Sequence, residues 1–74
     1  MSAKDIQNYG RNIRSLRMQL EMTQLDLASA VCVCDNHIGQ IERGYRCGNL
    51  DLAIRLSKFF GCSLDELVSS ECKN

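Results

Sequence analysis

Hydrophobic residues recur every three or four positions along the first part of the chain. Between residues 3 and 21 these positions are Ile6, Tyr9, Ile13, Leu16 and Leu20. This spacing places them on one face of an α-helix, while Lys4, Arg11 and Arg14 fall on the solvated side. The pattern therefore predicts a first amphipathic helix over this segment.

Two short helices separated by a turn are predicted next. Thr23 and Asp26 have the spacing of a capping pair, so we expect a second helix that begins there and ends near Val31. Cys34 stands at the capping position of a third helix, and Gly44 suits the left-handed conformation that ends one. The residues expected to face inward are Leu27, Ala28, Val31, Ile38 and Ile41.

Two further helices complete the pattern. Asn49 caps a fourth helix that Gly61 ends, and Ser63 with Glu66 forms a capping box for a short fifth. Their expected apolar residues are Leu50, Ala53, Ile54, Leu56 and Phe60 in the fourth, and Leu64, Leu67 and Val68 in the fifth. The prediction is one compact all-α, five-helix domain over residues 1–74, with a core of about 5–69 and a frayed tail at 70–74.

Composition supports a small helical protein. The chain has 74 residues, no proline, and only two phenylalanines and two tyrosines, which disfavours a β-sandwich. There is no apolar run long enough to cross a membrane and no signal-peptide pattern, so we expect a cytoplasmic protein with no membrane partner. Nine basic residues balance nine acidic ones, which argues against strong non-specific nucleic-acid binding but leaves room for a local basic patch.

The cysteines and the single histidine suggest no catalytic or metal site. The five cysteines are Cys32, Cys34, Cys47, Cys62 and Cys72, expected to be reduced thiols in a cytoplasm. Cys32 and Cys34 are separated by one residue, fewer than zinc sites usually have, so His37 and Cys47 nearby do not change the expectation of no metal and no cofactor. No nucleophile has a partner base and no glycine loop could hold a phosphate, so no enzyme is expected.

The segment from Gly10 to Leu67 resembles the phage-repressor and Cro family of helix-turn-helix domains, also called the xenobiotic-response-element family. The matching pieces, in order, are GRNIRSLRMQLEMTQ, the Leu27–Ala28 pair, Ile38-x-x-Ile41-Glu42-Arg43-Gly44 and NLDLAIRLSKFFGCSLDEL. Each piece is weak alone, but their order and separations are specific. Two positions depart from the family: Cys32 replaces the usual turn glycine, which implies strain, and Gly48 replaces a frequent proline, which implies a looser loop.

The resemblance implies a lambda-repressor-like fold and a transcriptional regulator, most often a repressor, that binds a two-fold symmetric operator as a homodimer. It places the third helix in the major groove of double-stranded DNA. The residues it assigns to base contacts are Asp35, Asn36 and Gln40, and His37, which faces solvent by helical phase, is a further candidate. The resemblance assigns Gln24 to a phosphate contact. Further candidates for phosphate contacts, from their positions beside the second and third helices, are Thr23, Arg43, Tyr45 and Arg46.

Further roles follow from the same resemblance. Arg17 and Glu42 are expected to form an internal ion pair, and Phe59, Leu64 and Val68 to contribute to a dimer interface. Gly39 either allows a close approach to DNA or has no role. Two alternatives remain open: a helix-turn-helix module that binds protein, such as an antirepressor or antitoxin, and a thiol-based sensor in which oxidation of Cys34 weakens DNA binding.

Overall fold

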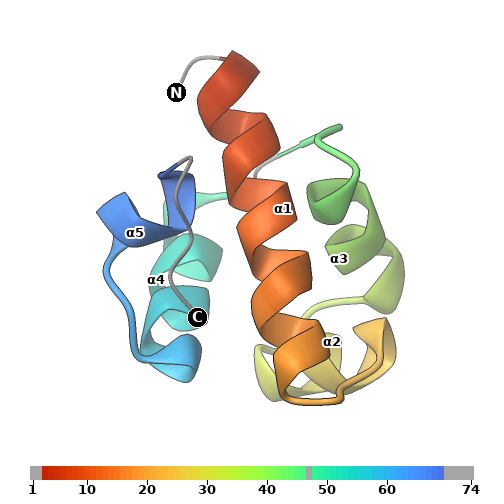
Figure 1. Ribbon diagram of the computed structural model, residues 1–74. Helices are drawn as coiled ribbons and strands as arrows, with labels where there is room; N and C mark the ends of the chain where they lie inside the picture. Colours follow the sequence, from red (N-terminus) through yellow and green to blue (C-terminus); the bar gives the residue numbers. More distant parts are fainter. Residues whose placement is uncertain (1–2, 47, 70–74) are drawn as a thin grey trace.

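The structure is a computed structural model that describes residues 3–46 and 48–69. The helices are α1 (Ala3–Gln19), α2 (Gln24–Ala30), α3 (Asp35–Glu42), α4 (Leu50–Phe60) and α5 (Leu64–Val68), as Figure 1 shows. No strand occurs in these two ranges, which confirms the predicted all-α class. The expectations for Cys47, Cys72 and the tail at 70–74 lie outside the described residues.

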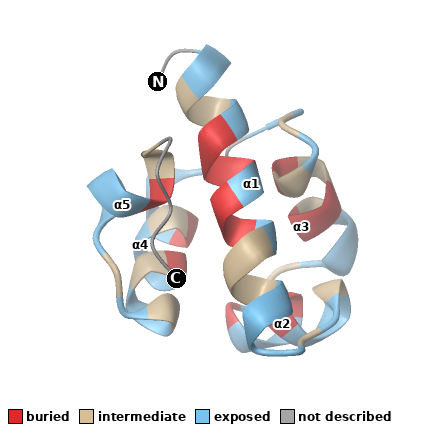
Figure 2. Ribbon diagram, in the orientation of Figure 1, coloured by how far each residue is buried: buried red, intermediate tan, exposed pale blue. Residues whose placement is uncertain are grey.

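The central element is α1, which separates two pairs of helices. In Figure 1, α2 and α3 lie on one side of α1 while α4 and α5 lie on the other. The packed pairs include α2 with α3, α1 with α3, α1 with α5 and α4 with α5. Figure 2 shows the buried part of α1 along its middle, where neighbours cover it from both sides. Because of this arrangement, α2 and α3 form a unit whose outer surface stays open.

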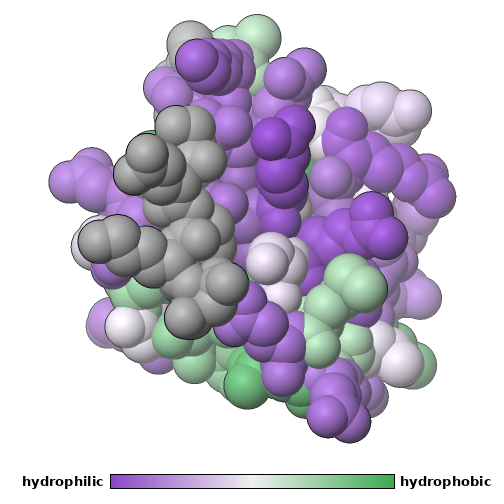
Figure 3. Space-filling model, viewed as in Figure 1, coloured by the Kyte–Doolittle hydropathy of each residue, from purple (hydrophilic) through white to green (hydrophobic). Residues whose placement is uncertain are grey.

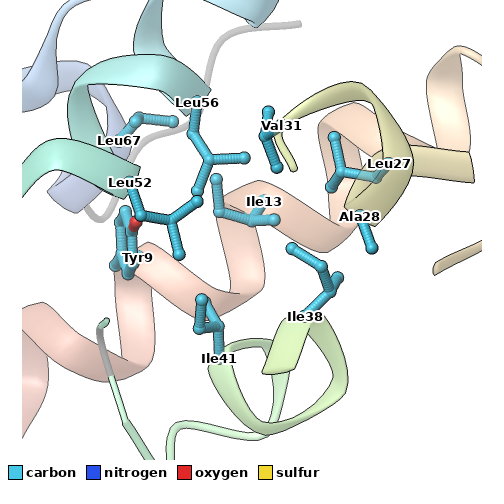
Figure 4. Close-up of a cluster of buried hydrophobic side chains, with 10 residues drawn as sticks. All are labelled: Tyr9, Ile13, Leu27, Ala28, Val31, Ile38, Ile41, Leu52, Leu56 and Leu67. Carbon is cyan, nitrogen blue, oxygen red and sulfur yellow. The ribbon is translucent and has the colours of Figure 1, made fainter. Parts of the chain in front are cut away.

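One core joins all five helices. Its members are Tyr9, Ile13, Leu27, Ala28, Val31, Ile38, Ile41, Leu52, Leu56 and Leu67, drawn in Figure 4. The inward positions predicted for the second and third helices are all buried. The stripe on α1 is shorter than predicted, because the helix ends at Gln19 and Leu20 lies beyond it with about half of its surface exposed. Glu21 then takes a left-handed φ of 56°, which turns the chain toward α2.

The register of α4 differs from the sequence prediction. Leu52 and Leu56 are its buried residues, whereas Leu50 is 67% exposed and Ile54 is 36% exposed. Asn49 accepts a hydrogen bond from the Leu52 amide at 2.8 Å, which fixes where the helix begins. Apolar residues occur on more than one face of this helix, so spacing alone could not select the buried one. The inward positions assigned to Leu50 and Ile54 were wrong.

The predicted caps of α2, α4 and α5 are confirmed. Thr23 and Asp26 form both bonds of a capping box, and so do Ser63 and Glu66. Gly61 closes α4 with a left-handed φ of 71°. These signals are local in the chain, so they do not depend on how the helices pack.

Two features of α1 bring its neighbours unusually close. At Gly10 an added Cβ would lie 2.1 Å from the backbone oxygen of Ile41, so only glycine lets α1 and α3 cross there. The buried side chain of Asn12 donates to the carbonyl oxygens of Leu67 at 2.7 Å and Ser69 at 2.8 Å. These carbonyls belong to the end of α5, where a helix lacks internal partners. Neither Gly10 nor Asn12 was singled out by the hydrophobic pattern.

Candidate nucleic-acid interface

The turn between α2 and α3 sets the angle between the two helices. Cys32 has a φ of 62°, so it takes the left-handed conformation that glycine would adopt more easily. The Val33 amide then donates to the Ala28 carbonyl at 2.9 Å, which folds the chain back over the end of α2. Cys34 is the N-cap of α3, but its side chain makes no capping hydrogen bond. The turn is therefore built, at some backbone strain, without a glycine.

Gly39 leaves room for the end of the Gln24 side chain, which reaches from α2 to α3. It is buried, and an added Cβ would lie 3.3 Å from the side-chain oxygen of Gln24. The nitrogen of the same Gln24 side chain donates to Glu42 at 3.1 Å. The contact at this glycine is thus with the side chain of the first residue of α2. This contact explains a glycine for which the sequence left two readings, a DNA contact or no role.

Arg17 and Glu42 form an ion pair that joins the end of α1 to the end of α3. Arg17 donates to the two carboxylate oxygens at 2.7 and 3.1 Å, and its third bond goes to the Met22 carbonyl at 2.7 Å. The Glu42 side chain is only 4% exposed. With Gln24 as a further donor, the carboxylate has three hydrogen bonds, which offset the loss of its hydration.

The outer face of α3 carries most of the residues assigned to base contacts. Asp35 and Asn36 are exposed and Gln40 is half-buried. One carboxylate oxygen of Asp35 accepts a hydrogen bond from the backbone N–H of Asn36 at 2.9 Å, which holds the carboxylate against the start of the helix. Asn36 and Gln40 follow the helical spacing that puts two residues on one face. They are the amide side chains available on this surface.

His37 is half-buried, so the expectation that it faces solvent holds only in part. Its Nε2 is buried and lies 3.4 Å from the point where a Cβ on Gly48 would stand. Within the described residues this nitrogen has no hydrogen-bond partner. Gly48 itself has a φ of 75°, a value that proline cannot adopt. The chain after α3 therefore takes a path that excludes the proline frequent at this position in the family.

The residues assigned to phosphate contacts are brought together only in part. Thr23, Arg43, Tyr45 and Arg46 are exposed, and Gln24 is half-buried. The Thr23 hydroxyl oxygen accepts the Asp26 amide in the α2 cap. Gln24 and Arg43 line one surface hollow together with Arg14. Tyr45 and Arg46 follow in the segment after α3.

Sequence reasoning placed Arg14 among solvated residues and missed its position beside Gln24 and Arg43. A signal was available. Arg14 precedes Arg17 by three positions, so the two lie on the same side of α1. Once Arg17 is assigned to Glu42 at the end of α3, Arg14 must lie near that end as well. Figure 3 shows a largely hydrophilic surface over α1 and α3.

Comparison with known families decides which class of protein this is. Residues 13–67 match the helix-turn-helix family. The chain belongs to this family. The match covers the last part of α1, all of α2, the turn, α3 and α4, and α5 up to Leu67, which agrees with the resemblance seen in the sequence.

Two relatives of this helix-turn-helix chain are repressors. One is the cryptic phage CTXphi transcriptional repressor RstR of Vibrio cholerae, 30% identical over 66 residues that make up 89% of this chain. The chain spans about 60% of the length of RstR. The other is the P22 c2 repressor, whose crystal structure was solved in complex with a synthetic operator. It is 33% identical, with a TM-score of 0.79 over 85% of this chain and 96% of that one.

The three residues assigned to a dimer interface of this helix-turn-helix protein lie on α4 and α5. Phe59 is 40% exposed and packs edge-on against Phe60, with ring centroids 5.2 Å apart. Leu64 and Val68 line an apolar hollow of about 420 Å³. Its other lining residues are Tyr9, Gly48, Asn49, Leu50, Ala53 and Asp65. The hollow and the exposed Phe59 give this side of the described surface an apolar area.

The remaining chemistry of the described segments is limited. Cys32 and Cys34 are exposed free thiols, and Cys62 is half-buried. No three His, Cys, Asp or Glu residues within 3–46 and 48–69 are grouped so that they could hold a metal ion. In the same ranges, no helix has both the length and the apolar character needed to span a membrane.

Proposed function

We propose that this protein is a transcriptional repressor that inserts α3 into the major groove of double-stranded DNA. The observation that carries the proposal is the α2–turn–α3 unit, held rigid by Gln24, Arg17 and Glu42 while the outer face of α3 stays open. The repressor function of RstR and the operator bound by the P22 c2 repressor support it. The role is binding without catalysis, in the cytoplasm where the DNA lies.

Asn36 and Gln40 are the proposed base-reading residues. Each carries an amide that can form two hydrogen bonds with adenine, and a good pair of this kind contributes about 1–3 kcal/mol of discrimination. Asp35 can accept from a cytosine amino group, although its charge also repels phosphate. His37 contributes less than its position on α3 implied, because Nε2 is buried.

The proposed phosphate contacts are Arg43, Arg46, Tyr45, Gln24 and the hydroxyl of Thr23. The side-chain amide of Gln24 keeps one N–H after its bond to Glu42, so it can bond Glu42 and a DNA phosphate at the same time. These contacts would set the register of the protein on the duplex without reading sequence.

The protein is proposed to act as a homodimer on a two-fold symmetric operator, where it blocks access of polymerase to a promoter. A single small module buries limited DNA surface, so a second copy is needed for useful affinity. Phe59, Leu64 and Val68 supply apolar surface for such a contact. Leu50, which the α4 register leaves exposed, lines the same hollow and extends this surface.

The test is a selection of random duplex DNA by the purified, reduced protein at ~0.1 to 0.15 M salt, the range in which specific affinities are compared. We expect an enriched two-fold symmetric motif. Gln40→Ala should weaken binding to that motif by about 1–3 kcal/mol per contacted half-site and relax the preference at one position.

Lys58→Ala, on the exposed side of α4, serves as the matched control and should bind the motif unchanged. If the folded wild-type protein enriches no motif, the repressor proposal is wrong. The protein-binding alternative, an antirepressor or antitoxin, would then be the one to pursue.

A further inference from the structure

A row of arginines lies beside the proposed DNA-binding surface, in two neighbouring hollows. The first hollow is lined by Arg14, Arg17, Gln24, Glu42 and Arg43, and the second by Gln7, Arg11, Arg14, Glu42, Arg43 and Gly44. The two share Arg14, Glu42 and Arg43. The proposed phosphate contacts Gln24 and Arg43 are thus continuous with a surface that runs along α1.

The positive charge of this surface is not neutralised within the described residues. Glu42 is the only acidic residue lining either hollow, and both of its oxygens are engaged by Arg17. Arg11, Arg14 and Arg43 are exposed, and none of the three forms an ion pair in the described part of the chain. A guanidinium stays charged at any physiological pH. Three like charges therefore converge on one strip of a chain whose formal net charge is zero.

The geometry of α1 explains how the strip is built. Gln7, Arg11 and Arg14 are spaced by four and three positions, which puts them on one face of the helix. Gly10 brings that part of α1 against the end of α3, because its missing Cβ leaves room for the Ile41 carbonyl. Because the two helices cross so closely, Arg11 and Arg14 of α1 lie beside Arg43.

We propose that Arg11 and Arg14 form a second set of DNA phosphate contacts that continues from Gln24 and Arg43 along α1. The proposal rests on the proposed function, since it concerns the same bound duplex. Arginine matches the geometry of a phosphate group, and each neutralised phosphate releases condensed counterions. This strip explains how a protein with balanced charges gains backbone affinity: the basic residues are gathered on one side.

The test compares the salt dependence of DNA binding among variants. Arg11→Ala, Arg14→Ala and the double variant are titrated against two labelled duplexes, one with the selected motif and one of random sequence. Each lost phosphate contact should reduce the slope of log K against log salt by about 0.9. At ~0.15 M salt this corresponds to roughly a five-fold loss for each single variant and about thirty-fold for the double.

Two controls separate a phosphate contact from other effects. Lys58→Ala removes the same charge from exposed α4, outside both hollows, and should keep the wild-type slope. Arg14→Lys keeps a cation that can meet phosphate as a point charge, so it should restore most of the slope lost in Arg14→Ala. The ratio of affinities for the two duplexes should not change in any of these variants, because phosphates carry no sequence information.

The outcomes distinguish this proposal from the proposed function. If the wild type binds but the arginine variants match Lys58→Ala, the α1 contacts are refuted and the repressor proposal stands. A loss of affinity with an unchanged salt slope would refute them as well. If the folded wild type binds neither duplex, both proposals fail. Far-UV circular dichroism checks that each variant is folded, as the exposure of both arginines leads us to expect.

Discussion

Cys32 holds a backbone conformation that is costly for any residue with a side chain. Its φ of 62° lies in the left-handed region, and it is the residue that reverses the chain between α2 and α3. The left-handed conformation costs a non-glycine residue roughly 1–2 kcal/mol. Glycine would relieve this strain but would also make the unfolded chain more flexible, which offsets part of the gain.

Cys32→Gly should therefore raise the free energy of unfolding by about 0.5–1 kcal/mol, measured from the midpoint of urea denaturation at constant m-value. Gly61→Ala is the reciprocal control. Gly61 has a φ of 71° and an added Cβ would meet nothing within 4 Å, so alanine there should destabilise by about 1 kcal/mol through the backbone alone. A lower midpoint for Cys32→Gly would show that the thiol makes a contact worth more than the strain.

Single residues differ in how far the sequence predicts them. The caps at Thr23, Asn49 and Ser63 were predictable because donor and acceptor lie three positions apart in the chain. His37 and Gly39 were not, because their surroundings come from Gly48 and Gln24 on other segments. Helical phase predicts which way a side chain points from its own helix, but it does not show which residues of other segments pack against that side.

At the scale of elements, the crossing of α1 and α3 depends on one missing side chain. An added Cβ at Gly10 would meet the Ile41 carbonyl oxygen at 2.1 Å and the Glu42 carbonyl oxygen at 3.1 Å. Both are backbone atoms of α3, which can move only if the helix moves. The gain of about 1 kcal/mol in helix propensity from glycine to alanine cannot compensate for that displacement.

Gly10→Ala should lower the free energy of unfolding by at least ~2 kcal/mol, measured by chemical denaturation. Gly39→Ala is the matched control, since Gly39 is also a buried helical glycine. Its added Cβ would meet only the end of the flexible Gln24 side chain at 3.3 Å, so stability should change by less than about 1 kcal/mol. Equal losses in the two variants would contradict the close crossing.

Hydrophobic spacing predicted the helices themselves but not how they pack against one another. The existence and order of five helices could be read from spacing, caps and glycines, because each signal is contained within one helix. The register of α4 could not, since Leu50, Ile54 and Leu56 offer competing apolar positions. The burial of Leu52 depends on the surfaces of the neighbouring helices. Packing that links distant segments, such as Asn12 with α5, has no counterpart in a local pattern.

At the scale of the whole molecule, the Arg17–Glu42 pair connects three helices. Arg17 bonds both Glu42 and the Met22 carbonyl, while Glu42 also bonds Gln24 at the start of α2. Removal of the cation alone would leave a carboxylate that is 4% exposed without its main partner. An uncompensated buried charge is strongly destabilising.

Arg17→Ala should lower the free energy of unfolding by roughly 2–4 kcal/mol at neutral pH, seen by thermal or urea denaturation. The double variant Arg17→Ala/Glu42→Gln removes both charges and should lose less than Arg17→Ala alone. DNA affinity of the folded protein should fall less than it does in Gln40→Ala. If the loss in the double variant equals the sum of the losses in Arg17→Ala and Glu42→Gln measured separately, the two side chains are not coupled.

The general character of the molecule was accessible from the sequence, but its charge distribution was not. The order and separation of the motifs were enough to indicate the helix-turn-helix family. The balance of nine basic and nine acidic residues gave no indication of a basic strip. That strip exists because α1 and α3 cross, so its arginines come from segments about thirty residues apart, as Arg14 and Arg43 show.

The bonds from Asn12 to the end of α5 have a consequence for the order of folding. They join residues 55 and 57 positions apart, so the loop they close is among the longest in the molecule. Such contacts form late, since the chain must lose the freedom of the whole loop first. During synthesis, α1 leaves the ribosome early, yet its α5-facing side stays uncovered until Leu67 arrives. A nascent chain stopped before residue 64 would already contain α3, but with an open core.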